Sequence, residues 1–168
     1  MKKTPALLIA LIATLGIALD IVGAAVVRLA PEFTWTGAGN KRATLKSLRG
    51  QPVVLIVADS VRNGDFRKQA KRLKELYQEF ASRNVVFFAA FEKDEPGVIP
   101  SDVPFVVAEN GAKIAADYQL QGKFNIVVIG PDGNVDMETS KLVPATRIKD
   151  VVINSFPAQS AERPGKAQ

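Results

Sequence analysis

A short polar stretch between an apolar run and a charged run holds the residues best placed to do chemistry. It follows Val53–Ala58 and precedes a periodic segment that begins near Phe66. In α/β proteins, binding and catalytic residues often lie on the loop that leaves a buried strand. Residues of these types could cap a helix, pair at the surface, bind an anionic group or divide acid and base roles between two carboxylates. The residues of this polar stretch that could do so are Asp59, Ser60, Arg62, Asn63, Gly64 and Asp65.

Two residue types that carry much of enzyme chemistry are missing from the chain. The sequence contains no cysteine and no histidine, which excludes thiol nucleophiles, disulfides, imidazole bases and metal sites built from thiolates or imidazoles. Asp132, Asn134 and Asp136 alternate as in a cation site, but the later glutamate of a calcium loop is missing, and the Pro-Asp-Gly-Asn order predicts a turn. We expect no metal site and no cofactor.

Asp59 and Asp65 are the carboxylates that could support an enzyme. Two neighbouring carboxylates can separate their pKa values and serve as acid and base. Their spacing across a loop is unspecific, and no other acidic motif accompanies it. Asn63 or Asp65 could cap the following helix, and Asn84 could end it. The structural alternative for the two carboxylates is that Asp65 is this cap and that Asp59 pairs with Arg62 at the surface.

The composition predicts one globular domain. The chain has 168 residues, of which 47% are hydrophobic and 23% charged, with a net charge of +5. Most Lys and Arg residues are interleaved with Asp and Glu, which is typical of a solvated helix face. We therefore expect no nucleic-acid partner.

The amino terminus predicts export. Lys2 and Lys3 precede an uncharged apolar run over residues 6–19, the arrangement of a signal peptide, and cleavage is plausible near Ala24 or Ala25. Without cleavage, residues 6–27 could anchor the chain in a membrane, and a buried helix of a cytosolic protein is a third alternative. The first two place the rest of the chain outside the cytoplasm. We expect residues 1–28 to be a signal peptide or anchor, 29–157 one domain and 158–168 a disordered tail.

The remaining pattern alternates strands and helices. Continuous apolar runs predict buried strands, and apolar spacings of three and four predict amphipathic helices. Pro131, Asp132 and Gly133 predict a hairpin between two extended runs. Together these elements predict an α/β fold, a mixed sheet with helices on both faces. The expected strands are 33–36, 53–58, 84–91, a short piece in 103–109, and the two arms of 124–139; the expected helices are a turn in 43–52, then 65–83, 112–120 and 145–156.

This order resembles the thioredoxin-like fold of peroxiredoxins and exported thiol-disulfide oxidoreductases. The motifs APEFTW (30–35) and TLKSLRGQPVVLIV (44–57) resemble the start of those proteins. The segment from PFVVAENG to GPDG (104–133) resembles their second half, with an Asn-Gly turn, a short helix ending in Tyr, a Gln-Gly pair and an Asp-Gly hairpin. The resemblance covers residues 30–156 and implies their fold.

Two departures from that family concern its chemistry. Such enzymes carry one or two cysteines at the start of the helix after the central strand, where Val61–Asp65 contains no sulfur. They also place a cis-proline before the strand facing the thiol, where this chain has Phe124 after Lys123. A cis bond before a residue other than proline costs about 2.5–4 kcal/mol, so we expect a trans bond.

A narrower resemblance is to the uncharacterised thioredoxin-like domains of bacterial exported proteins and of animal sushi-repeat extracellular proteins. The shared features are the apolar strand at Val53–Val57, the acidic loop residue Asp59, the pair Arg67 and Gln69, the GPDG hairpin at 130–133 and the VVINSFPAQ segment at 151–159. This resemblance implies an interaction role.

The hypothesis that follows is a redox-inactive binding module. Arg62 above an open helix start, with Lys123 and Phe124 facing it, could hold a peptide or an anionic group of an unknown envelope protein. A membrane-anchored scaffold subunit is a further alternative. The candidate binding residues are Asp59, Arg62, Asn63, Gly64, Asp65, Lys123 and Phe124.

Overall fold

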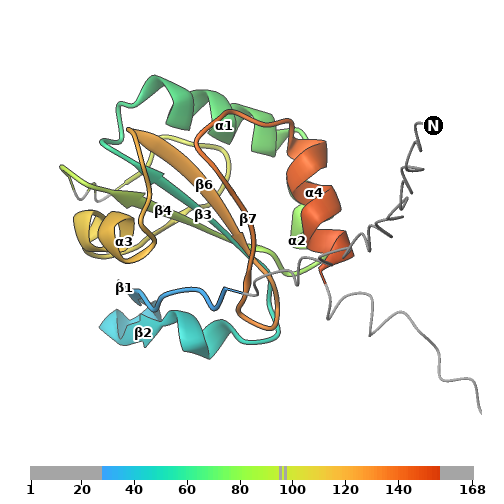
Figure 1. Cartoon of the computed structure of the whole chain (residues 1–168), viewed down its shortest axis with the longest axis horizontal. Helices are drawn as coiled ribbons and strands as arrows, with labels where there is room; N and C mark the ends of the chain where they lie inside the picture. The colour runs from blue at the N-terminus through green and yellow to red at the C-terminus, as the bar shows by residue number, and fades with distance from the viewer. Residues whose placement is uncertain (1–27, 95, 97, 156–168) are drawn as a thin grey trace, which may run out of the picture.

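The computed structural model describes residues 28–94, 96 and 98–155, and its centre is a mixed sheet of five strands. Their order across the sheet is β5-β4-β3-β6-β7 (Figure 1). β3 pairs in parallel with β4, β4 with β5 in the same sense, and β6 and β7 continue the sheet antiparallel on the other side of β3. The strands are β3 (Val53–Ala58), β4 (Val86–Phe91), β5 (Val106–Val107), β6 (Phe124–Ile129) and β7 (Val135–Thr139).

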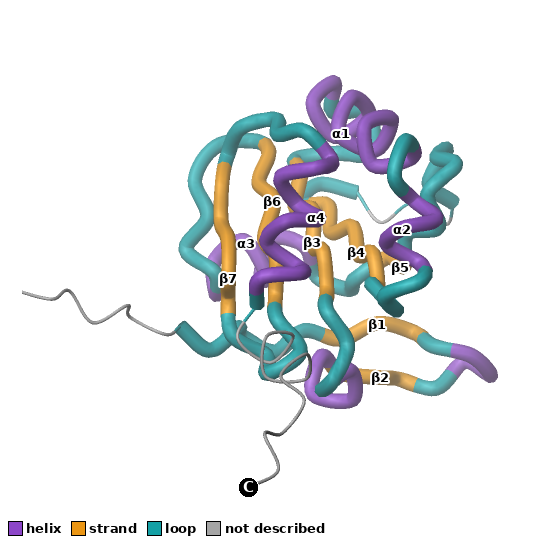
Figure 2. Tube along the Cα trace, turned by 90° about the vertical axis from the view of Figure 1, so that its right-hand side faces the viewer, coloured by secondary structure: helices purple, strands orange, loops and turns teal. Residues whose placement is uncertain are grey.

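Helices cover both faces of this sheet, as the sequence predicts. They are α1 (Gly64–Lys74), α2 (Tyr77–Ala81), α3 (Gly111–Asp117) and α4 (Ala145–Asn154). A separate antiparallel pair, β1 (Thr34–Thr36) and β2 (Arg42–Thr44), precedes β3 (Figure 2). Short 3₁₀ turns at Ala38–Asn40 and Leu45–Leu48 complete this entry segment.

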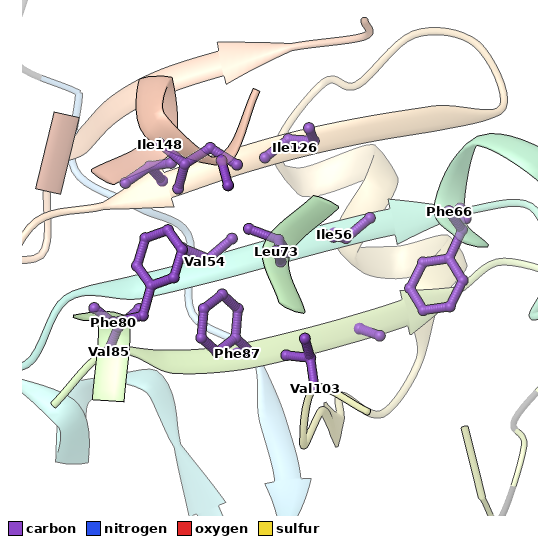
Figure 3. Close-up of a cluster of buried hydrophobic side chains, with 14 of the residues drawn as sticks. Val54, Ile56, Phe66, Leu73, Phe80, Val85, Phe87, Val103, Ile126 and Ile148 are labelled. Atoms are coloured by element: carbon purple, nitrogen blue, oxygen red, sulfur yellow. The ribbon is translucent and has the colours of Figure 1, made fainter. Parts of the chain in front are cut away.

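Alternate residues of each central strand feed two separate cores, because successive side chains of a strand point to opposite faces. On one face, Val54 and Ile56 pack with Phe66 and Leu73 of α1 and with Ile148 of α4 (Figure 3). All five side chains are fully or almost fully buried. This core fixes α1, and therefore the loop that precedes it, against the sheet.

The opposite core joins α3 and the entry segment to the sheet. Leu55 and Phe88 of the sheet pack with Trp35 of β1 and with Tyr118 at the end of α3. The Trp35 and Phe88 rings lie edge to face with centroids 4.7 Å apart. The Tyr118 hydroxyl donates to the Pro31 carbonyl at 2.8 Å, which satisfies the polar end of this buried side chain.

The single helix expected over 65–83 is wrong: the structure has two helices with a break at Glu75 and Leu76. The backbone of Leu76 leaves the helical region, with φ −118° and ψ 17°. The apolar spacing nevertheless continues through the break, which is why periodicity alone does not reveal it. After the break, Phe80 packs edge to face on Phe87 of β4, with ring centroids 5.4 Å apart.

Other local expectations have mixed outcomes. Asn84 adopts the left-handed conformation, φ 56°, after α2, which confirms its role in ending the helix. β2 was not expected. The bond before Phe124 is trans, as predicted, and the described residues contain no cis peptide bond.

Several expectations fall outside the described residues. Residues 1–27 of the expected signal peptide or anchor and the tail expected at 158–168 lie outside the described residues, as do Phe156 and Pro157 at the end of the expected domain. Among the residues that the structure does describe, no helix has the length and apolar character needed to span a membrane.

Candidate functional site

A groove lies where α1 begins and β6 begins, at the end of the sheet to which β3 points. Its volume is about 530 Å³. β3 and β6 are antiparallel and pair Ala58 with Phe124, so the loop leaving β3 and the loop entering β6 meet at this edge (Figure 1). We call it the helix-start groove; its lining is Asn63, Gly64, Asp65, Gln121, Gly122, Lys123, Phe124 and Ser140.

Asn63 holds the two sides of the helix-start groove together. Its side-chain oxygen accepts hydrogen bonds from the backbone N–H groups of Asp65 at 2.9 Å and Phe66 at 3.0 Å, so it is the N-cap of α1. Its side-chain nitrogen donates to an Asp59 carboxylate oxygen at 2.8 Å and to the Lys123 carbonyl at 3.0 Å. One amide thus links the loop after β3, the first turn of α1 and the segment before β6.

Asp59 supports this arrangement as an anion. The hydrogen bond from Asn63 lowers the pKa of the Asp59 carboxyl below its ordinary value, and the charges of Lys93 and Lys123 act in the same direction. The Asp59 N–H also donates to the Lys123 carbonyl at 3.0 Å. A catalytic acid at neutral pH needs the opposite shift, so this environment suits a structural carboxylate better than a proton donor.

The structure brings five of the seven predicted site residues into the groove lining. They are Asn63, Gly64, Asp65, Lys123 and Phe124. Asp59 lies behind Asn63 rather than on the lining, and Arg62 is exposed and does not line the groove.

Phe124 does not present its ring as an open binding surface. The residue is only 5% exposed and belongs to the core beneath α1 and α4. The residue that stands where the related enzymes have their cis-proline is therefore used for packing.

The structural alternative for the two carboxylates is wrong in both details, whereas the prediction that Asn63 could cap the helix is confirmed. Asn63, not Asp65, caps α1, and Asp65 lies 3.5 Å from Lys68 instead. The ion pair of Asp59 is with Lys93, at 3.6 Å, and no Asp59–Arg62 pair occurs in the described part of the chain.

Three lining residues were not predicted from the sequence. Gln121 and Gly122 come from the Gln-Gly pair noted above, and Gly122 has a positive φ of 82° that glycine adopts without strain. Ser140 follows β7 and has no local sequence signal. It reaches the groove only because β7 pairs with β6.

Residues 131–133 form the predicted turn, and Asp136 lies beyond it in β7. The Asp132 carboxylate accepts hydrogen bonds from the backbone N–H of Asn134 at 3.0 Å and from its side-chain amide at 2.6 Å. Burial, with the nearby Asp132 charge, raises the pKa of Asp136 to about 6. Within the described ranges, no three His, Cys, Asp or Glu side chains are grouped so that they could hold a metal ion.

Several solved structures are similar to this chain over most of its length. One is a putative thiol:disulfide interchange protein from Chlorobium tepidum, with 15% identity, TM-score 0.60 and coverage of 74% of this chain and 93% of that one. A reduced 2-Cys peroxiredoxin from Plasmodium vivax has 16% identity, TM-score 0.58 and coverages of 80% and 96%. An exposed lipoprotein thioredoxin from Streptococcus pneumoniae has 15% identity, TM-score 0.53 and coverages of 71% and 99%. The fold is thioredoxin-like, which confirms the resemblance.

A family assignment follows. Residues 44–162 match the model of a domain of unknown function, DUF4174, and the chain belongs to this family. No curated protein matches the chain. A thioredoxin-like fold without a single cysteine is consistent with a redox-inactive domain.

Proposed function

We propose that this protein is an extracytoplasmic binding module that holds an extended peptide or protein segment in the helix-start groove. The observation that carries the proposal is the groove itself, about 530 Å³, which lies at the start of α1 and β6 in a chain without any thiol. Its volume is within the range of pockets that bind small ligands or short peptide segments. The scaffold is retained, and its opening is lined by hydrogen-bonding groups instead of sulfur.

The lining favours a neutral, hydrogen-bonding ligand over a simple anion. Asn63 already occupies the Asp65 and Phe66 N–H groups at the start of α1, where an anion would otherwise bind. Asp65 adds a negative charge at the same place. Gln121, Lys123 and Ser140 are exposed and offer the donors and acceptors that an extended backbone needs.

Crosslinking in the native cell envelope tests this proposal. A photoreactive residue at Gln121 of the full chain is expected to trap a partner, whereas the same residue at Arg147, which is exposed but outside the groove, is not. Ser140→Trp fills the groove and should lower the Gln121 yield about tenfold, because a few central contacts dominate most interfaces. Lys141→Trp introduces the same side chain at the neighbouring exposed position and should leave the yield unchanged.

Equal yields from Gln121 and Arg147, or equal effects of the two tryptophans, would remove the groove from the proposal. The same preparation is expected neither to reduce insulin nor to consume peroxide, because no thiol is present. Either activity would contradict the redox-inactive assignment.

Export rests on the amino-terminal sequence. Lys2 and Lys3 before the apolar run at 6–19 have the pattern of a secretion signal. The exposed lipoprotein thioredoxin among the similar structures is consistent with the same location. Whether the leader is cleaved or retained as an anchor decides between a free module and a membrane-attached one.

A further inference from the structure

A second hollow lies along α1 and is lined by basic side chains. Its volume is about 300 Å³. Arg67, Lys71 and Lys74 of α1 form one wall, and residues 100–102 form the other. We call it the basic groove. It shares no lining residue with the helix-start groove, so it is a separate surface.

We propose that the basic groove binds an extended acidic peptide segment with carboxylates at alternate positions. The first reason is the regular placement of its cations. Arg67, Lys71 and Lys74 stand at i, i+4 and i+7, so they form one stripe along the helix. All three residues are exposed.

Two of the three cations in this stripe have no ion-pair partner among the described residues. Lys74 pairs with Asp102 across the groove at 2.6 Å. Arg67 and Lys71 form no ion pair with any residue that the structure describes. The Arg67 guanidinium and the Lys71 ammonium group are neighbours on an exposed surface and repel each other. An anionic ligand between them would reduce this repulsion.

Asp102 shows which kind of group this wall accepts. A carboxylate from the chain itself already lies on the third cation of the stripe. A ligand that continues the same pattern would place its own carboxylates on Lys71 and Arg67.

The spacing of the two free cations selects an extended ligand. A helix rises about 1.5 Å per residue, so Arg67 and Lys71 are about 6 Å apart along the axis. Side chains on one side of an extended strand repeat about every 6.7 Å. Two carboxylates at i and i+2 of such a segment therefore match Arg67 and Lys71. Phe66 and Ala70 line the same hollow between the two walls.

Fluorescence anisotropy of the full chain in a neutral detergent tests the proposal. The probe is a labelled peptide of alternating glutamate and threonine, and the control peptide carries glutamine in place of glutamate. We expect binding of the glutamate peptide alone, with an affinity that falls as salt is added. The double variant Arg67→Gln, Lys71→Gln should weaken binding about tenfold or more, because charge-assisted hydrogen bonds are lost.

A matched control removes the same charge from the same helix. Lys68 and Arg72 are again four residues apart, one residue further along α1, and neither lines the basic groove. Lys68→Gln, Arg72→Gln should change the affinity by about twofold at most, as expected from long-range charge alone. Both double variants alter the helix surface, and their thermal unfolding midpoints verify that the fold is retained.

Asp102→Asn gives the opposite sign. It frees Lys74 and removes a competing carboxylate, so it should tighten binding about threefold. The proposal is overturned if the two double variants weaken binding equally, if Asp102→Asn weakens it, or if the glutamine peptide binds as well as the glutamate peptide. Ser140→Trp in the helix-start groove should leave this affinity unchanged, so failure of one groove is distinguishable from failure of the other.

Discussion

At the scale of single residues, Asn63 joins the start of α1 to the loop before β6. The four hydrogen bonds of its side chain lie between 2.8 and 3.0 Å. Two cap the helix and two hold Asp59 and the Lys123 carbonyl. The two functions are separable, because the cap uses the side-chain oxygen and the bridge uses the nitrogen.

Replacing Asn63 separates them. Asn63→Ala should lower the free energy of unfolding by about 1 kcal/mol or somewhat more, the usual cost of losing an N-cap. Asn63→Ser retains a capping oxygen and should lose less. Both variants remove the donor to Asp59, so in both the pKa of Asp59 should rise toward its ordinary value. Denaturant unfolding and a carboxyl NMR titration measure the two effects.

The sign of the associated pH dependence follows from the lowered pKa. A carboxyl whose pKa is lower in the folded state stabilises the fold above its unfolded pKa, and this stability is lost as the pH falls through the folded value. Acidification should therefore cost the native chain more stability than it costs either Asn63 variant. Identical acid sensitivity in all three proteins would show that Asn63 does not control Asp59.

At the scale of elements, α3 packs unusually close to the sheet at one glycine. A Cβ built on Gly111 would lie within 2.6 Å of three backbone atoms of Phe91, all of which are fixed in the structure around β4. Asn110, just before it, adopts the left-handed conformation with φ 64°. The Asn-Gly pair, taken from the sequence as a turn, thus also sets the distance between α3 and the sheet.

Gly111→Ala is expected to destabilise the protein by about 3 kcal/mol, at the upper end of the usual cost of overpacking. Gly64→Ala is the matched control: its Cβ would meet no atom within 4 Å, and alanine favours a helix by about 0.5–1 kcal/mol over glycine. Chemical denaturation measures both. A loss at Gly64 equal to the loss at Gly111 would mean that loss of backbone freedom, not the contact with Phe91, causes the effect.

The elements themselves were largely predictable because their signals are local. β3 and β4 are continuous apolar runs, β6 is apolar except for Asn125, and α1 has a strong three-four spacing. β2 was missed because its strand character comes from pairing with β1, held in turn by Glu109. That carboxylate accepts hydrogen bonds from Thr34, Thr36 and Arg42, and the Arg42 contact in particular lowers the pKa of Glu109.

At the scale of the whole molecule, the chain enters the domain at the end of the sheet remote from the helix-start groove. The Arg28 carbonyl accepts from the Val135 N–H at 2.8 Å, and its guanidinium pairs with Glu138 at 2.9 Å. Val135 pairs with Ile129, the last residue of β6, whereas the groove lies at its first residue. We expect that, if the leader is retained in a membrane, the helix-start groove faces away from it.

Export can be measured with the leader alone. Residues 1–28 fused to alkaline phosphatase, which becomes active only after its disulfides form outside the cytoplasm, should yield active enzyme in a bacterial host. Leu11→Arg with Leu15→Arg interrupts the apolar run and should abolish the activity. Equal activity from both fusions would contradict a secretion signal, and the size of the processed product distinguishes cleavage from retention.

The sequence by itself determined the absence of thiol and imidazole chemistry, the order of the main elements and the loop at which to look, because these depend on residue type and local periodicity. The tertiary structure decided which side chains form the site. Asn63 meets the Lys123 carbonyl across 60 residues of sequence, and Ser140 arrives from a third segment. Phe124 lines the groove with only 5% of its surface exposed and otherwise packs in the core. Such placements depend on strand pairing and on the competition of side chains for buried space, which no local pattern records.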